Sequence, residues 1–101
     1  MSSPVNQSGA ETLTTSSTAI GVTASLTDGK ARHAIFQVLG SAVRFRADGT
    51  APTSTTGLRV EAGGTIEFMD SPSYEGVIRN IQFILDGSGA ANGTVECAYY
   101  N

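Results

Sequence analysis

The chain is built from short runs in which apolar and polar residues alternate, and glycine-containing turns separate these runs at intervals of roughly ten residues. Alternation with a period of two places apolar side chains on one face of a β-strand, whereas a helix needs a period of about 3.6. No stretch combines that helical period with capping residues. The sequence therefore predicts an all-β fold: a compact antiparallel β-sandwich or jelly-roll-like barrel of about seven to eight short strands, with an extended N-terminal arm.

The alternating runs also predict where the individual strands lie. We expect strands over residues 20–26, 32–39, 42–47, 58–62, 65–69 and 94–100, and a short bend followed by a central strand over 77–85. In the run at 32–39, the inner face is expected to hold Ala34, Phe36 and Val38. The last run is expected to place Cys97 and Tyr99 inward.

The two runs between residues 58 and 69 lead to more specific expectations. Alternation places Leu58 and Val60 on the inner face of the first run. Gly63-Gly64 separates the two runs by a tight turn, and such a pair between alternating runs is typical of a β-hairpin. We therefore expect these two strands to pair with each other.

The N-terminal residues differ from the rest of the chain because they are polar and rich in serine and threonine. The 101 residues fit one domain. We expect a polar N-terminal arm over 1–18 and a single β-sandwich domain over 19–101. Because a polar arm stays disordered unless something holds it, we expect a partner to order this one. Its candidate contact residues are Ser2, Pro4 and Val5.

Charge and cysteine content exclude several classes of protein. The net charge of −3 argues against nucleic acid as a partner, because binding to phosphates depends on basic residues. No apolar run is long enough to span a membrane, so we expect no membrane partner, and the N-terminus does not resemble a secretory signal. The single Cys97 excludes a disulfide within the chain.

Residues that could carry out chemistry are few. His33 is the only histidine and is expected at a sheet surface, and Cys97 is expected to pack as a small apolar residue. We interpret the scattered aspartates as turn residues whose side chains bond the local backbone: Asp28, Asp48, Asp70 and Asp86. The sequence therefore predicts neither an enzyme nor a cofactor or metal site.

Two arginines, Arg44 and Arg46, alternate with apolar residues in one predicted strand. Their guanidinium groups could bind carboxylates of a partner protein. Alternatively, they could line a solvated face and form cross-strand ion pairs, with Glu61 and Glu67 as available acids. Outside the arm, the candidate side chains for contact with a partner protein are Arg44, Arg46, Arg59 and Tyr100.

Two stretches carry a resemblance to known proteins: AVRFRADGTAPTSTTGLRVEAGGTIEF at 42–68 and IRNIQFILDGSGAANGTVECAYY at 78–100. They resemble a group of small proteins encoded by tailed phages, over Ala34 to Tyr100, and DGTAPT at 48–53 is the most specific element. The resemblance implies a virion structural protein, and a capsid decoration (cement) protein suits the size and acidity best.

The implied partners are the major capsid protein or other virion proteins and further copies of the chain, as a dimer or trimer. The implied location is the capsid surface of the virion, after synthesis in the host cytoplasm. Two alternatives stay open. One is a tail, neck or fibre-associated virion protein. The other is a carbohydrate-binding β-sandwich module with Tyr74, Tyr99 and Tyr100 on a concave face.

Overall fold

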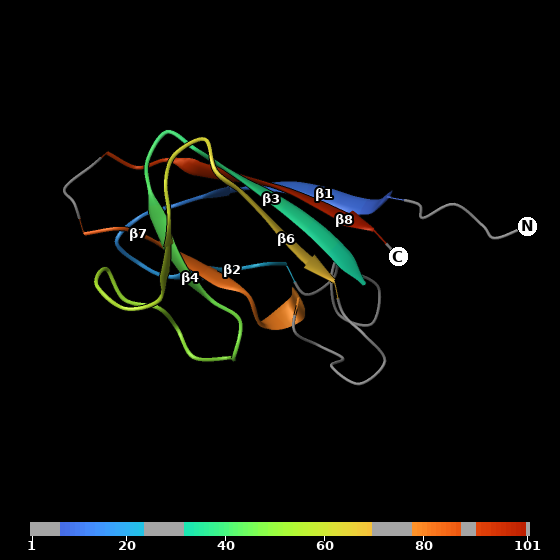
Figure 1. Ribbon diagram of the computed structural model, residues 1–101, viewed down its shortest axis with the longest axis horizontal. Helices are drawn as coiled ribbons and strands as arrows, with labels where there is room; N and C mark the ends of the chain where they lie inside the picture. The colour runs from blue at the N-terminus through green and yellow to red at the C-terminus, as the bar shows by residue number, and fades with distance from the viewer. Residues whose placement is uncertain (1–6, 24–31, 70–77, 88–90, 101) are drawn as a thin grey trace, which may run out of the picture.

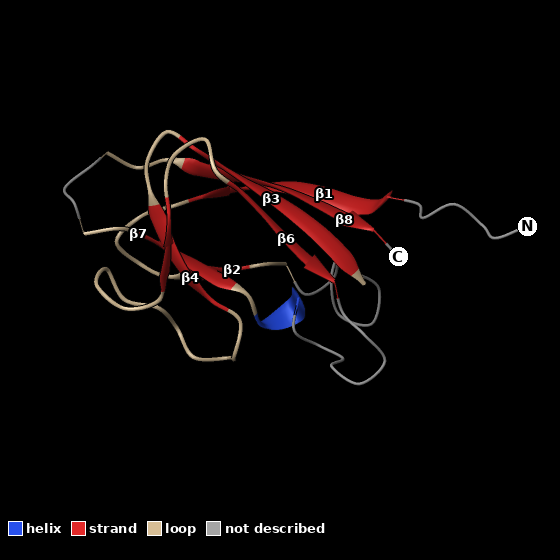
Figure 2. Ribbon diagram, viewed as in Figure 1, coloured by secondary structure: helices blue, strands red, loops and turns tan. Residues whose placement is uncertain are grey.

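The computed structural model describes residues 7–23, 32–69, 78–87 and 91–100. Its strands are β1 (Gln7–Thr14), β2 (Ile20–Gly21), β3 (His33–Leu39), β4 (Val43–Arg46), β5 (Leu58–Val60), β6 (Thr65–Met69), β7 (Gln82–Leu85) and β8 (Thr94–Tyr100), and a single 3-10 turn, η1 (Ile78–Asn80), precedes β7. The strands form two sheets of four, shown in Figures 1 and 2. Sheet A has the order β1-β8-β3-β6 and sheet B the order β2-β7-β4-β5.

Strand pairing follows a regular rule along the chain. The first strand pairs with the last, the second with the seventh, the third with the sixth and the fourth with the fifth. Two further pairings, β3 with β8 and β4 with β7, join these pairs into the two sheets, and every pairing is antiparallel. The prediction of an all-β antiparallel fold is therefore confirmed.

The hydrophobic core lies between the inner faces of the two sheets. On β3, Ala34, Phe36 and Val38 are fully buried, as their alternation predicts. The ring of Phe36 lies 5.2 Å, centroid to centroid, from the ring of Phe83 on β7 of the other sheet. The inward prediction for Tyr99 is confirmed as well. Period-two alternation thus identified the inner faces of the central strands.

The N-terminal segment differs from the expected arm. Residues Gln7–Thr14 form β1, which pairs with β8 of the same chain at the edge of sheet A, so its own chain holds this part in place. A boundary at residue 18 therefore does not separate an arm from the sheets. Ser2, Pro4 and Val5 lie outside the described residues.

The predicted hairpin between 58–62 and 65–69 is wrong, because β5 belongs to sheet B and β6 to sheet A. The Gly63-Gly64 turn connects the sheets and bonds to β3: the Gly63 N–H donates to the Val38 carbonyl at 2.6 Å, and the Val38 N–H donates to the Gly64 carbonyl at 2.9 Å. Gly63 has φ +89°, which glycine adopts without strain. The glycine pair reverses the chain, and the strands on its two sides, β5 and β6, pair with β4 and β3 respectively.

The inward expectation for Leu58 also fails, since 68% of this residue is exposed. Leu58 begins the three-residue edge strand β5, opposite Phe45 of β4. Alternation sets the face on which a side chain lies but not whether the other sheet covers it. The bend and strand predicted over 77–85 are confirmed as η1 and β7, with β7 between β2 and β4.

The run predicted at 20–26 contributes the two-residue strand β2, and its part from residue 24 onward lies outside the described residues. The described parts of the chain contain no helix with the length and apolar character to cross a membrane.

Candidate functional site

The polar cluster that contains Arg44 and Arg59, two of the predicted contact residues, lies on the outer face of sheet B. Arg44 on β4 stands directly opposite Arg59 on β5 in the strand register. Two like charges in this position repel each other. An acidic side chain between them is therefore needed to stabilise the pair.

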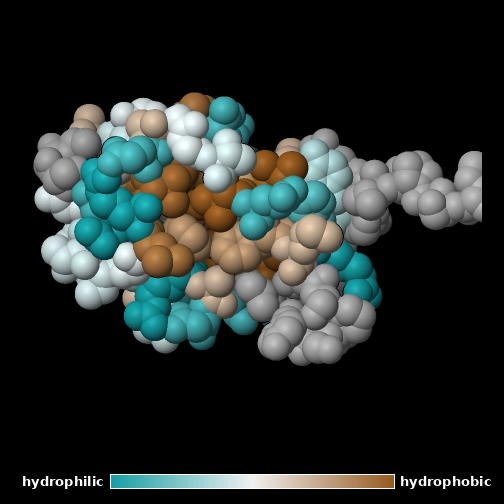
Figure 3. Space-filling model, viewed as in Figure 1, coloured by the Kyte–Doolittle hydropathy of each residue, from teal (hydrophilic) through white to brown (hydrophobic). Residues whose placement is uncertain are grey.

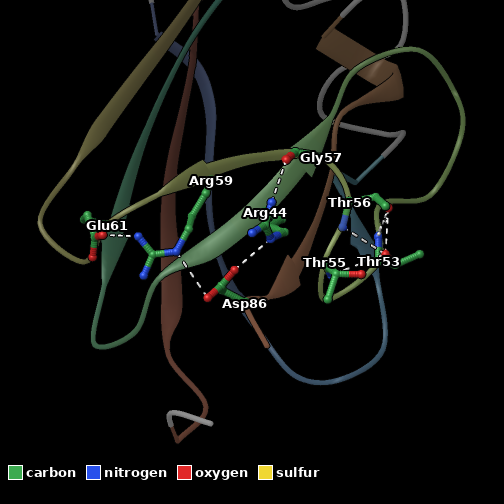
Figure 4. Close-up of polar contacts among 8 residues, drawn as sticks. All are labelled: Arg44, Thr53, Thr55, Thr56, Gly57, Arg59, Glu61 and Asp86. Atoms are coloured by element: carbon green, nitrogen blue, oxygen red, sulfur yellow. Dashed lines mark hydrogen bonds and ion pairs between the residues drawn. The ribbon is translucent and has the colours of Figure 1, made fainter. Parts of the chain in front are cut away.

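Asp86 supplies that acid. One carboxylate oxygen, Oδ1, accepts a hydrogen bond from Arg44 Nε at 2.7 Å, and Oδ2 lies 3.2 Å from Arg59 Nε (Figure 4). Asp86 follows β7 directly, and its backbone N–H donates to the carbonyl of Ala42 at 3.1 Å. Only 6% of Asp86 is exposed, so a buried carboxylate bridges the two arginines.

Both arginines have additional partners within the chain. Nη1 of Arg44 donates to the carbonyl of Gly57 at 3.0 Å, and Nη1 of Arg59 pairs with the carboxylate of Glu61. The hydrogen bonds that Arg59 donates to Glu61 and, to a lesser extent, to Asp86 raise the pKa of Arg59 above its usual value. The guanidinium groups are thus anchored on the sheet rather than extended into solvent.

The threonine-rich loop between β4 and β5 is held by its own side chains. Oγ1 of Thr53 lies 2.6 Å from Oγ1 of Thr56 and accepts the N–H groups of Thr55 and Thr56 at 3.3 and 3.0 Å. Gly57 ends the loop with φ +114°, and a Cβ there would lie 3.0 Å from the carbonyl oxygen of Phe45. Figure 4 shows these threonines beside the arginine cluster.

This loop is also connected to the segment that carries Asp86. The backbone N–H of Gly87 donates to the carbonyl of Ser54 at 2.9 Å, and Pro52 is buried. The loop, the two arginines and Asp86 therefore form one connected unit.

Arg46 forms a separate and more exposed pair with Asp48. Their contacts are Nε to Oδ1 at 3.2 Å and Nη2 to Oδ2 at 2.5 Å. The Asp48 carboxylate also accepts the N–H of Thr50 at 3.1 Å, and these bonds lower its pKa to about 2. The turn role predicted for Asp48 is thus confirmed, whereas the Asp86 carboxylate bonds arginines of two neighbouring strands.

Three guanidinium groups and three carboxylates meet on this face, so their formal charges balance. A balanced cluster fixes strands and loop relative to each other and produces little net attraction for an anion. The structure therefore realises the ion-pair interpretation of Arg44 and Arg46, although with different acids from those expected. Glu67 instead pairs with His33 of β3, at 2.7 Å.

The remaining candidates lie on or within sheet A. Tyr100 lies near His33, with ring centroids 5.5 Å apart. Cys97 is buried, and burial raises the pKa of its thiol to about 12, so it is not a reactive nucleophile. Among the residues that the structure describes, no group of three or more His, Cys, Asp or Glu is placed to hold a metal ion. Asp28, Asp70 and Tyr74 lie outside those residues.

A second carboxylate with structural contacts, Glu11 on β1, was not identified from the sequence. Its Oε2 accepts the hydroxyl of Tyr99 at 2.5 Å and the N–H of Thr23 at 2.9 Å, and its Oε1 accepts the Thr23 hydroxyl at 2.5 Å. A signal for the burial of Asp86 was present, because it directly follows the apolar run Phe83-Ile84-Leu85. Glu11 lies in a polar segment that offers no such signal.

Comparison of the chain with protein-family models, with curated proteins and with solved structures produced no match.

Proposed function

We propose that this chain is a non-enzymatic structural protein of a tailed-phage virion, and specifically a decoration (cement) protein that stabilises the capsid from outside. We further propose that its two sheets form a jelly-roll sandwich. The order of the strands is the observation that carries both proposals.

In that order, each strand of the first half of the chain pairs with its counterpart in the second half, counted from the opposite end. A long antiparallel hairpin that wraps around a core produces this arrangement, with four strands in each of two sheets. Such eight-stranded jelly rolls recur in viral capsid domains and in lectins. The strand order therefore favours these classes, and the resemblance of residues 34–100 to phage proteins favours the first.

The polar side chains add support because they serve the fold. Asp86 bridges Arg44 and Arg59, and Glu11 is bonded to Tyr99 and to the segment after β2. Groups used in this way stabilise a rigid binding module. On a capsid, many identical contacts act together, so a modest interface per copy is sufficient.

Counting copies in purified virions of the phage that encodes the chain tests this proposal. Quantitative mass spectrometry should find it in a fixed ratio to the major capsid protein, and in separated heads rather than tails. Mild heating should release it from heads in full. About a dozen copies or fewer per particle, found with tails, would instead support the alternative of a tail, neck or fibre-associated protein.

The carbohydrate-binding alternative is less well supported. Tyr99 is fully buried, so its ring is not available as a stacking platform for a sugar, and Tyr100 is partly buried. Binding of the purified chain to a glycan array, lost on substitution Tyr100→Ala, would favour this alternative.

A further inference from the structure

The four edge strands of the two sheets differ in how they are protected. An edge strand presents unpaired N–H and C=O groups, and proteins block such edges with bulges, inward-pointing charges or very short strands. The edge strand β1 has a bulge between Gln7 and Gly9, and it carries the inward-bonded carboxylate of Glu11. The edge strands of sheet B, β2 and β5, have two and three residues.

The fourth edge strand, β6, has none of these protections. It has five residues, its sequence TIEFM contains no proline, lysine or arginine, and its register with β3 runs without a bulge. Among the described strands it pairs with β3 alone. Its edge is thus the longest regular backbone edge without such a device in the described part of the chain.

The hydrogen bonds of β3 show which backbone groups of β6 face outward. Val38 exchanges bonds with the Gly63-Gly64 turn, so even-numbered residues of β3 bond toward β6. Their partners Ile66 and Phe68 then use their N–H and C=O groups toward β3. The N–H and C=O groups of Thr65, Glu67 and Met69 consequently point away from the sheet.

Apolar side chains accompany this edge. Met69 is 74% exposed, whereas Ile66 and Phe68 are only partly buried against the core. Figure 3 shows hydrophobic residues gathered in the middle of one face, with hydrophilic residues around them. A backbone edge with apolar flanks is suited to pairing with another strand.

We propose that β6 is the site at which a second copy of this chain binds, by antiparallel pairing of β6 with β6 about a two-fold axis. A second copy fits because this symmetry keeps the inner faces together, so Ile66 and Phe68 of both copies continue one apolar layer. The same two-fold rotation places the outward N–H and C=O groups of one β6 strand opposite those of the other, so that they can form hydrogen bonds. Glu67, the only charged residue of β6, has its carboxylate 2.7 Å from His33 Nε2 of β3, so this contact holds it on the β3 side of the strand.

This proposal does not depend on the virion role, because the purified chain tests it directly. Light scattering and sedimentation at about 100 μM should give twice the chain mass of 10.4 kDa. Thr65→Lys/Met69→Lys places two charges on exposed positions of the edge and should shift the mass to that of one chain. A monomeric wild-type chain at this concentration would overturn the proposal.

The matched control carries the same two charges on exposed positions of the opposite edge, as Ala10→Lys/Thr14→Lys, and should stay dimeric. Circular dichroism should show that both variants keep the fold. If the control dissociates while the β6 variant stays dimeric, the interface is at β1 and the proposal fails.

Cross-linking provides a second measurement. In a Cys97→Ala background, a thiol at Glu67→Cys should be joined to the second copy by a short bismaleimide, whereas one at Thr12→Cys on β1 should not. Equal cross-linking at both positions, or cross-linking at Thr12 alone, would contradict pairing through β6.

Discussion

Asp86 and Glu11 are two carboxylates that join parts of the molecule, and their partners differ in kind. Asp86 lies on the outer face of sheet B and is bonded to two guanidinium groups. Glu11 bonds to a phenol, a hydroxyl and a backbone N–H, and so connects β1 of sheet A to Thr23, two residues after β2 of sheet B. One carboxylate is balanced by charge and the other by neutral donors.

The difference determines how each site responds to loss of its negative charge. Around Asp86, the two arginine partners are permanently charged donors that cannot reverse their hydrogen bonds. Around Glu11, the Thr23 hydroxyl can donate or accept. We therefore expect the Asp86 cluster to depend on charge and the Glu11 cluster to depend mainly on hydrogen bonding.

The largest effect should come from Asp86→Asn. The amide nitrogen would face a guanidinium N–H, and two opposed arginines would lose their shared acid, so the free energy of unfolding should fall by about 3 kcal/mol. Urea denaturation followed by fluorescence or circular dichroism measures this change. The exposed substitution Asp48→Asn serves as the control, and an equal loss in both variants would show that the bridge has no special role.

Alkaline pH should lower the free energy of unfolding through Cys97 and Tyr99, the two buried residues next to Glu11. Burial raises the pKa of Cys97 to about 12, and burial together with the bond to Glu11 raises the pKa of Tyr99. Both pKa values are higher in the folded chain than in the unfolded chain. These groups therefore contribute their full stabilisation below the ordinary thiol pKa, and this contribution is lost as pH rises above it. For Cys97 alone, the loss should reach about 2 kcal/mol between pH 9 and 10.5.

Denaturation of the wild-type chain and of Cys97→Ala over this pH range measures that contribution. The variant should lose stability less steeply as pH rises. Parallel curves for the two proteins would contradict the assignment to Cys97.

A smaller effect is expected from Glu11→Gln. The amide oxygen can still accept the Tyr99 hydroxyl, and the amide nitrogen can donate to the Thr23 hydroxyl, so the loss should be about 1 kcal/mol. A loss as large as that of Asp86→Asn would remove the distinction between the two carboxylates. Thermal and urea unfolding of both amide variants, side by side, decide the matter.

The smallest effect is expected from Arg46→Gln. This side chain and Asp48 are both more than one-third exposed, and solvent screens an exposed ion pair. The midpoint of urea unfolding should shift by no more than corresponds to about 0.5 kcal/mol. A larger shift would mean that this pair belongs to the same connected unit as Asp86.

Sequence reasoning succeeded where inward residues are apolar. Phe36 on β3 and Tyr99 on β8 lie two positions from the buried residues Val38 and Cys97, and their burial follows from this period of two. Between residues 9 and 14 of β1, where burial is described, the partly or fully buried positions are Gly9, Glu11 and Leu13. Only the last is a large apolar residue, so the segment looked like a polar arm.

The remaining errors concern contacts between distant parts of the chain. The Gly63-Gly64 turn indicates a reversal but cannot reveal that β6 joins β3 and β5 joins β4. The role of Asp86 likewise depends on Arg44, which lies 42 residues away in the chain. Local patterns define the strands and their faces, whereas these long-range partners are set by the packing of the whole fold.

The central place of β8 in sheet A has a consequence for the synthesis of the protein. β1 and β3 both pair with β8, so β1 is joined to the rest of sheet A only after residues 94–100 have left the ribosome. Contacts between residues so far apart in sequence make folding slow, and β1 stays unpaired in the meantime. We therefore expect nascent chains that stop before residue 94 to remain sensitive to protease, and protection to appear only when the last strand is available.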